Sequence, residues 1–299
     1  MIPFHESAPR RPAVADPLPV AQLPGLAARI RLHAVRMVAM HGLGYLGQAL
    51  SSAEGFAVLY GRYYRPGTDR LVVSPGHYVI AAFAAAAERG MLDDDELRTY
   101  GHNGSRLEAI GTERAPAVDL TCGSLGQGLS AAVGFALADR LQGRPDSRTL
   151  AVVSDGELEE GQLWEAAMFA GHHRLGALTV LLDANDSQVD GPVTEITTVE
   201  PIADKWRSFG WDARDVDGHD AAVDHAVATD RPAIVIARTS TRHGLETVGP
   251  DRVLLGSDHP YPLGEQPPGE VIRTNPGLSA TEKAALLRGN ARTYLGLAD

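Results

Sequence analysis

One stretch in the middle of the chain constrains the fold more than any other, because it predicts two buried strands joined by a helix. The apolar run 149–153 predicts a strand that ends at the turn Asp155-Gly156. Residues 177–182 predict a second strand, and residues 160–174 between them have the apolar spacing of a helix. Because strands joined in this way run parallel, the chain is expected to be an α/β protein around a mainly parallel sheet.

Polar side chains follow both predicted strands. Asp155 comes directly after the first strand, and Asn185 follows the second. Ligands of open α/β sheets bind at the carboxyl ends of the strands, so both side chains are expected at one site. Mg²⁺ prefers oxygen ligands and usually takes one or two carboxylates together with phosphate oxygens. The pattern indicates a magnesium site that holds a diphosphate, although an isolated Asp-Gly pair is most often only a turn.

A glycine-rich turn precedes another predicted helix, residues 130–141. The turn has the sequence Gly-Ser-Leu-Gly-Gln-Gly at positions 123–128. Glycines allow backbone N–H groups to approach a phosphate, and a helix N-terminus favours negative charge. Close helix packing explains the same small residues, so the turn alone leaves both interpretations open.

A second glycine pattern, at residues 42–47, fits the G-x-G-x-x-G sequence of dinucleotide-binding proteins. That pattern indicates an NAD site only where it follows a strand and precedes a helix. Residues 26–38, which come before it, have helical spacing instead. We therefore do not expect an NAD site.

The composition argues against several functions. The 299 residues carry a formal net charge of −11, which gives no attraction to nucleic acid or to an anionic membrane. Cys122 is the only cysteine, so no disulfide can form within the chain, and its place beside the glycine-rich turn indicates packing rather than a nucleophile. Since no run reaches the length of a membrane span and the N-terminus lacks an apolar signal core, a cytoplasmic protein is expected.

The motifs together resemble transketolase. The resemblance is closest to the separate N-terminal subunit of a split transketolase, the half that grips the diphosphate of thiamine diphosphate. It covers roughly residues 25–265. The residues that carry it are the turn at 123–128, Asp155-Gly156 with Asn185, Gln-Val-Asp-Gly at 188–191, Glu-Pro-Ile-Ala-Asp-Lys-Trp at 200–206 and Val-Asp-Gly-His-Asp at 216–220.

The resemblance implies which residues hold the cofactor. Asp155 and Asn185 would be side-chain ligands of Mg²⁺, and Ser187 would supply its backbone carbonyl. The backbone N–H of Gly156 would bind the diphosphate, and Leu125 would lie against the cofactor's rings. The full expected cofactor-binding set is Gly123, Ser124, Leu125, Gly126, Asp155, Gly156, Glu157 and Asn185.

The resemblance also implies catalytic residues. His77 and His259 match histidines that face the substrate and cofactor in transketolases. Glu160 matches a carboxylate near the subunit interface that helps active sites communicate. Glu165 fits that role too, but a solvated helical pair with Glu160 explains it as well.

The chain departs from the family at substrate-binding positions. Tyr45 and Ile110 stand where transketolases have histidines that bind substrate hydroxyls. An isoleucine cannot form a hydrogen bond, so a pocket built around it should leave a hydroxyl unpaired. These departures motivate an alternative acyl donor such as pyruvate, in specialised metabolism of branched sugars. Ser154 replaces the usual glycine before Asp155, a change that need not remove metal binding.

The resemblance implies a second subunit. In this family a glutamate on another domain activates the aminopyrimidine of thiamine diphosphate. After residue 237 about sixty residues remain, fewer than the ~100 of a usual second α/β domain. We therefore expect a pyrimidine-binding C-terminal transketolase subunit to supply this glutamate, in an α₂β₂ assembly.

The implied function is transfer of a two-carbon unit from a ketose or 2-oxo acid donor to an aldehyde or ketone acceptor, by an enzyme that uses thiamine diphosphate and Mg²⁺. The enzymatic alternatives are the α subunit of a 2-oxo acid dehydrogenase, which should lack this form of the glycine-rich turn, and deoxyxylulose-phosphate synthase, which carries both halves on one chain. A degenerate scaffold subunit that only holds the cofactor is the non-enzymatic alternative. Retention of Asp155, Asn185 and Glu160 favours the enzyme.

The remaining sequence patterns predict the domain organisation. The proline-rich residues 1–20 predict a mobile N-terminal arm, and residues 21–299 predict a single three-layer domain of the thiamine diphosphate-binding fold. A capping box formed by Ser279 and Glu282 predicts a C-terminal helix. Further strands are expected at 71–73, 213–216 and 233–237, and further helices at 53–60, 81–89, 201–209 and 220–228.

Overall fold

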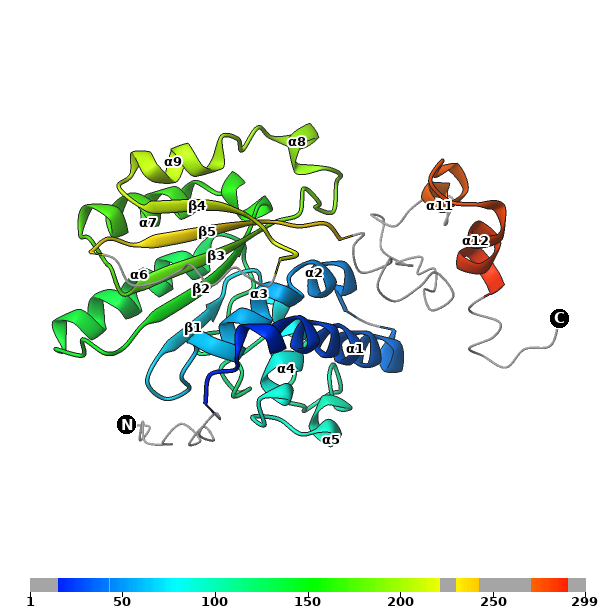
Figure 1. Cartoon of the computed structure of the whole chain (residues 1–299), viewed down its shortest axis with the longest axis horizontal. Helices are drawn as coiled ribbons and strands as arrows, with labels where there is room; N and C mark the ends of the chain where they lie inside the picture. The colour runs from blue at the N-terminus through cyan, green and yellow to red at the C-terminus, as the bar shows by residue number, and fades with distance from the viewer. Residues whose placement is uncertain (1–15, 43, 221–229, 242–269, 290–299) are drawn as a thin grey trace. The chain divides into compact units, whose positions relative to one another are not determined.

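Five parallel strands form one sheet in the part of the chain that the computed structural model describes, residues 16–42, 44–220, 230–241 and 270–289 (Figure 1). Their order in the sheet is β1-β2-β3-β5-β4. The strands are β1 (Arg70–Val73), β2 (Thr149–Ser154), β3 (Leu178–Ala184), β4 (Asp212–Asp217) and β5 (Ala233–Arg238). The predicted α/β fold with a mainly parallel sheet is confirmed.

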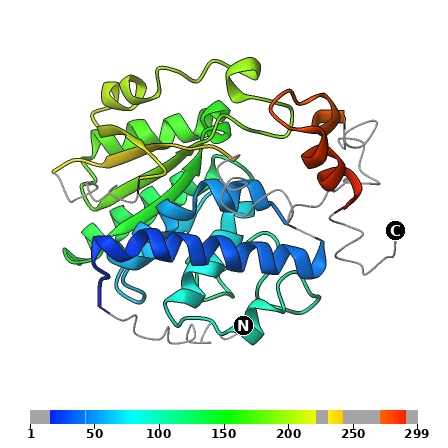
Figure 2. The same cartoon turned by 45° about the vertical axis from the view of Figure 1, so that its right-hand side comes forward.

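Helices cover both faces of the sheet, and the two groups lie on opposite sides in both views (Figures 1 and 2). One group comprises α1 (Leu23–His41), α2 (Leu46–Ser51), α3 (Ala53–Val58) and α4 (Val79–Glu88). The other comprises α6 (Gln127–Leu141), α7 (Gly161–His172) and α9 (Ile202–Ser208). This three-layer arrangement explains why the central strands are apolar along their whole length.

Alternate residues of β2 belong to two separate cores. Leu150 and Val152 pack with α1, α3 and α4, whereas Ala151 and Val153 pack with α6, α7 and α9. All six residues of β2 are buried. Because successive side chains of a strand point to opposite faces, burial of every residue requires a layer of helices on each face.

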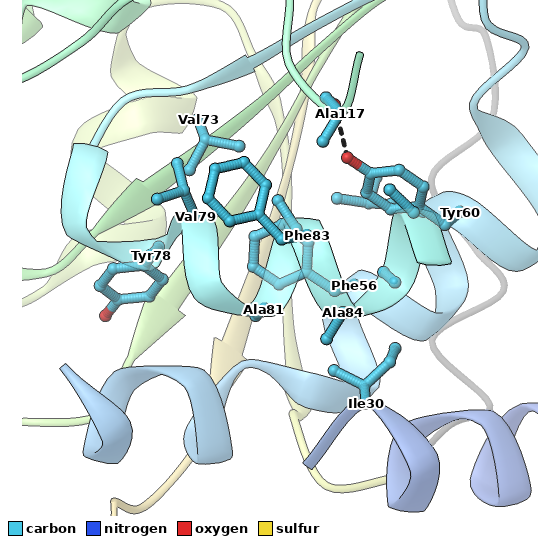
Figure 3. Packing of buried hydrophobic residues seen from close by; sticks show 14 of the residues in the cluster. Ile30, Phe56, Tyr60, Val73, Tyr78, Val79, Ala81, Phe83, Ala84 and Ala117 are labelled. Carbon is cyan, nitrogen blue, oxygen red and sulfur yellow. Dashed lines mark hydrogen bonds between the residues drawn. The ribbon is translucent and has the colours of Figure 1, made fainter. Parts of the chain in front are cut away.

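The first core fixes the turn that follows β1. Val79 and Phe83 of α4 pack among Phe56, Ile30 and other buried side chains (Figure 3). The middle of α4 is rich in alanine and fully buried, so its neighbours can approach closely. The short helix η3 (Gly76–Tyr78) leads directly into α4, and its position is therefore set by this packing.

Short elements complete the first of two compact units, Met1–Ser240 and Thr241–Asp299. They are η1 (Val20–Gln22), the π-helical turn η2 (Leu59–Tyr63), α5 (Asp94–Leu97), η4 (Gly156–Glu159) and α8 (Val193–Ile196). In the second unit, α11 (Glu270–Thr274) precedes α12 (Ala280–Ala284) and the π-helical turn η6 (Ala285–Gly289). None of the described helices is both long and apolar enough to cross a membrane.

Most predicted elements are present with small differences in their ends. The helix predicted at 160–174 ends at His172 because Arg174 adopts a positive φ of 48° and the N–H of Leu175 returns to the carbonyl of Ala170. The Ser279–Glu282 capping box is confirmed. The helix predicted at 220–228 and most of the predicted arm, 1–15, lie outside the described residues.

Candidate functional site

Four strands end at the same edge of the sheet and bring polar residues together there. Ser74 follows β1, Asp155 follows β2, and Thr239 follows β5. Asp183 and Asn185 lie in and just after the end of β3. The sequence prediction that Asp155 and Asn185 share one edge is therefore confirmed at the level of topology.

Asp155 is a buried carboxylate, with 4% of its surface exposed. Its Oδ1 accepts a hydrogen bond from the N–H of Gly156 at 3.0 Å, and its Oδ2 accepts one from the N–H of Asp186 at 2.6 Å. Burial raises the pKa of Asp155 to about 7, and the charge of Asp183 adds to this shift. A buried carboxylate next to another one favours a bound cation, because a charge taken out of water needs an opposite charge nearby.

Asn185 is also buried, and its amide has a defined orientation. The Nδ2 group donates to Asp183 Oδ2 at 2.8 Å and to the Tyr78 hydroxyl at 3.0 Å. Its Oδ1 accepts from the N–H of Ser187 at 2.9 Å. Asp186 has a positive φ of 53°, which bends the loop. As a result, the N–H of Asp186 faces Asp155 and the N–H of Ser187 faces Asn185.

The donor set at this edge suits a hard cation. It contains a carboxylate, the amide oxygen of Asn185 and the backbone of Ser187, which is half-buried in the same loop. No group of three or more His, Cys, Asp or Glu residues in the described part of the chain could hold a metal ion. A metal at this edge would thus need further oxygen ligands from water or phosphate, which is the usual situation of Mg²⁺.

Glu157 connects the glycine-rich turn to the strand ends. Its carboxylate is fully buried and accepts from the N–H of Gly126 at 2.7 Å, from the N–H of Ser154 at 3.0 Å and from the Ser74 hydroxyl. The Ser74 Oγ in turn accepts from the N–H of Gly128 at 3.1 Å. The predicted cofactor-binding residue Glu157 thus points into the protein, where it holds the turn in place.

The glycine-rich turn lies at the start of α6 with Gly123 and Ser124 exposed and Leu125 half-buried. Gly126 has a positive φ of 80°, and a Cβ atom there would lie 2.7 Å from Cβ of Glu160. Glycine is required at this position for both reasons. Glu160 and Glu165 are exposed, and Glu160 lies beside this turn at the start of α7.

His77 lies on the turn after β1, close to the glycine-rich turn. A Cβ atom on the preceding Gly76 would lie 1.9 Å from the carbonyl oxygen of Cys122, so the two turns pack backbone to backbone. Burial lowers the pKa of His77 to about 4, so its imidazole is neutral at pH 7. His259 lies outside the described residues.

The two positions that depart from the family pattern are beside His77. The ring centroids of Tyr45 and His77 are 4.8 Å apart. Ile110 lies against Gly76, the residue before His77, because its Cγ2 would be 2.7 Å from a Cβ atom on that glycine. Both side chains are partly exposed, so they contribute to the surface that surrounds His77.

Sequence reasoning missed Asp183 and its partners. This side chain accepts hydrogen bonds from Ser51, Tyr78, Asn185 and Thr239. A signal was present, because Asp183 is the one charged residue of a mostly apolar strand, and buried charges need partners. The identity of those partners depends on contacts between distant parts of the chain.

Comparison with known proteins decides the family. A model of the transketolase, thiamine diphosphate binding domain matches residues 25–274. The chain belongs to the transketolase family. It therefore contains the family's thiamine diphosphate binding domain, and the predicted recognition is confirmed.

Two relatives of this transketolase-family chain are similar over most of their length. The chain is 42% identical over 241 residues to a transketolase family protein of Sinorhizobium fredii, covering 75% of this chain and 85% of that protein. It is 41% identical over 213 residues to the 6-deoxy-6-sulfo-D-fructose transketolase subunit SqwG of Clostridium sp., covering 66% of this chain and 77% of that protein.

A solved transketolase shares the fold. The structure of transketolase from Leishmania mexicana matches with a TM-score of 0.67 at 29% identity, over 73% of this chain. The match covers 36% of the Leishmania chain. This transketolase-family chain thus corresponds to about a third of that protein.

Proposed function

We propose that this chain is the diphosphate-binding subunit of a two-subunit transketolase-like enzyme. Such an enzyme transfers a two-carbon unit from a ketose or 2-oxo acid donor to an aldehyde or ketone acceptor. The main support is that the buried Asp155 carboxylate and the loop that carries the Asn185 amide oxygen lie at the same edge of the sheet. Both belong to a thiamine diphosphate binding domain. The glycine-rich turn that Glu157 holds supports it.

Asp155, Asn185 Oδ1 and the Ser187 carbonyl would hold Mg²⁺, and the N–H of Gly156 would bind the diphosphate. Gly123 and Ser124 are exposed on the glycine-rich turn and would contact the cofactor, with Leu125 against its rings. The N–H of Gly126 is already donated to Glu157, so Gly126 would act by shaping the turn. When bound, thiamine diphosphate supplies the electron sink for cleavage of the donor's carbon–carbon bond.

The neutral imidazole of His77 can both donate and accept a hydrogen bond, because one ring nitrogen carries a proton and the other a lone pair. This is the property needed to orient a substrate hydroxyl or carbonyl and to move a proton at a ring nitrogen. Tyr45 packs against this ring. His259 stays a predicted second substrate-facing histidine.

A second subunit would complete the active site. The chain corresponds to about a third of a solved transketolase, and the relative SqwG is named as a subunit. We infer a pyrimidine-binding partner that supplies the catalytic glutamate, in an α₂β₂ assembly. Glu160 lies beside the glycine-rich turn, and Met168 and Phe169 further along α7 are exposed, which supports an interface on this helix.

Pyruvate is a second candidate donor because of Ile110. This side chain lies against the turn that carries His77, where a polar residue would be needed to bind an additional substrate hydroxyl. An apolar side chain favours a donor whose transferred fragment has a methyl group instead.

Steady-state rates of the complex isolated through this chain would test the function. With saturating thiamine diphosphate and Mg²⁺, the proposal expects turnover of xylulose 5-phosphate or pyruvate in the presence of an aldehyde acceptor. Turnover of the sugar phosphate alone would rule out the pyruvate candidate. No turnover of any ketose or 2-oxo acid by a cofactor-loaded complex would favour the scaffold subunit.

A further inference from the structure

We propose that Asp183 is a positioning residue that decides which end of the Asn185 amide faces the metal. The inference rests on the proposed function, because it concerns the site in which Asn185 would be a ligand. It adds a residue that is not itself a ligand but controls whether one is correctly oriented. An amide presents either an oxygen, which binds Mg²⁺, or an NH₂ group, which does not.

Asp183 connects four separate segments beneath the strand edge. Its side chain is 2% exposed. Its Oδ2 accepts from the Ser51 hydroxyl at 2.8 Å, from the Tyr78 hydroxyl at 2.9 Å and from Asn185 Nδ2 at 2.8 Å. Its Oδ1 accepts from the hydroxyl of Thr239. These donors come from α2, η3, the end of β3 and the end of β5.

Two of these contacts determine the amide orientation. The Asp183 carboxylate accepts hydrogen bonds, so it selects the NH₂ end of the Asn185 amide. The Tyr78 hydroxyl donates its proton to Asp183, which leaves its lone pair to accept the other amide N–H. Both amide protons are therefore used on the buried side, and Oδ1 is left for the loop of Ser187.

A flipped amide would be unfavourable at this position. Its oxygen would face the Asp183 carboxylate and the lone pair of the Tyr78 hydroxyl, so acceptors would oppose acceptors. Its NH₂ group would face the N–H of Ser187, so a donor would oppose a donor where an oxygen is required. Buried groups that orient metal ligands in this way typically change metal affinity 10–100-fold when they are removed.

Asp183→Asn tests the proposal because it keeps the shape but offers an NH₂ group as well as an oxygen to Asn185. The probe is Mn²⁺ with thiamine diphosphate, titrated into the EDTA-treated complex isolated through this chain, with free Mn²⁺ followed by electron paramagnetic resonance. We expect D183N to bind Mn²⁺ about 10–100-fold more weakly than the wild type while its melting transition is retained. Tyr78→Phe should show a smaller loss in the same direction.

Ser51→Ala is the matched control. It removes a donor from the same carboxylate and the longest contact of the Asn185 amide, from Nδ2 to Ser51 Oγ at 3.5 Å, but it leaves the two shorter ones. Its loss of affinity should therefore be several-fold smaller. Unchanged Mn²⁺ affinity in D183N, or an equal loss in S51A and D183N, would overturn the orienting role. If D183N does not fold, Y78F decides, and unchanged affinity there overturns the proposal. If the wild-type complex binds no Mn²⁺, the proposed function fails instead.

Discussion

Glu157 and Asp183 are both buried carboxylates beneath the same edge of the sheet, but they are held by different kinds of donor. Glu157 accepts from two backbone N–H groups, those of Gly126 and Ser154, and from one hydroxyl. Asp183 accepts from four side chains of four segments. Burial raises the pKa of both carboxyl groups, and the hydrogen bonds oppose that effect.

The type of donor determines what each carboxylate controls. Every residue except proline carries a backbone N–H donor, so Glu157 fixes the path of the glycine-rich turn. Side-chain donors exist only while their residues are kept, so Asp183 depends on the identities of residues 51, 78, 185 and 239. The first carboxylate shapes the backbone around a diphosphate, and the second orients side chains around a metal.

The largest effect is expected at Asp155, the proposed metal ligand, because neither Glu157 nor Asp183 can replace it. Asp155→Ala should abolish Mg²⁺-dependent retention of thiamine diphosphate by the complex, because it removes the carboxylate from the strand edge. Retention is measured by mass after desalting with Mg²⁺ or with EDTA. Glu195→Ala, which removes an exposed carboxylate nearby in the chain and outside the family motifs, is the control and should retain the cofactor. Unchanged retention in D155A would refute the metal assignment.

Truncation of Glu157 removes the carboxylate that is held by backbone donors. Glu157→Ala leaves two buried N–H groups and the Ser74 hydroxyl without their acceptor, so we expect the free energy of unfolding to fall by roughly 4 kcal/mol. Urea unfolding followed by circular dichroism measures it. Glu157→Gln keeps one acceptor oxygen and should cost about half as much. A loss below about 1 kcal/mol in E157A would show that this carboxylate does not hold the turn.

In His77, burial alone shifts the pKa, and no hydrogen bond or charge opposes the shift. The pKa of His77 in the folded protein is about 4, against 6.5 for an ordinary histidine. Between these values the unfolded chain binds more protons than the folded one. The free energy of unfolding therefore has its full value, as far as His77 is concerned, above pH 6.5. It falls by roughly 3 kcal/mol in all as the pH drops toward 4.

An NMR titration of the imidazole and unfolding curves of His77→Gln check this prediction. The His77 resonances should show a neutral ring down to about pH 5, and H77Q should be less sensitive to pH between 6.5 and 4. A measured pKa near 6.5 would mean that the ring is solvated rather than buried.

The smallest effect is expected from losing one of the four donors to Asp183. Thr239→Val has nearly the same shape but no hydroxyl, so we expect a loss of about 1.5 kcal/mol in unfolding free energy, since a hydrogen bond to a charged group is removed while three remain. The same urea experiment measures it. A loss as large as that of E157A would remove the distinction between backbone-held and side-chain-held carboxylates.

Much of the fold could be predicted because its signals are local. The apolar run that became β2 and the spacing that became α7 are readable within about fifteen residues. The rule that parallel strands end at one edge then placed Asp155 and Asn185 together. These steps need no knowledge of distant contacts.

The rest of the site could not be predicted, because it depends on packing between distant segments. Glu157 lies in a short 3₁₀ turn, where no periodicity tells whether a side chain points inward or outward. The donors to Asp183 include Ser51 and Tyr78, more than one hundred positions away in the sequence. The contact of Tyr45 with His77 likewise joins segments that are separated in the sequence by α2, α3, η2 and β1.

Native mass spectrometry of this chain, purified from its own cells with the subunits it carries, tests whether it is the cofactor-binding subunit of a two-subunit enzyme. We predict a complex with a second, different subunit. This complex carries the mass of thiamine diphosphate and Mg²⁺, loses both in EDTA, and regains both only when both are added. A homo-oligomer that stays free of thiamine diphosphate and Mg²⁺ after both are supplied would contradict it.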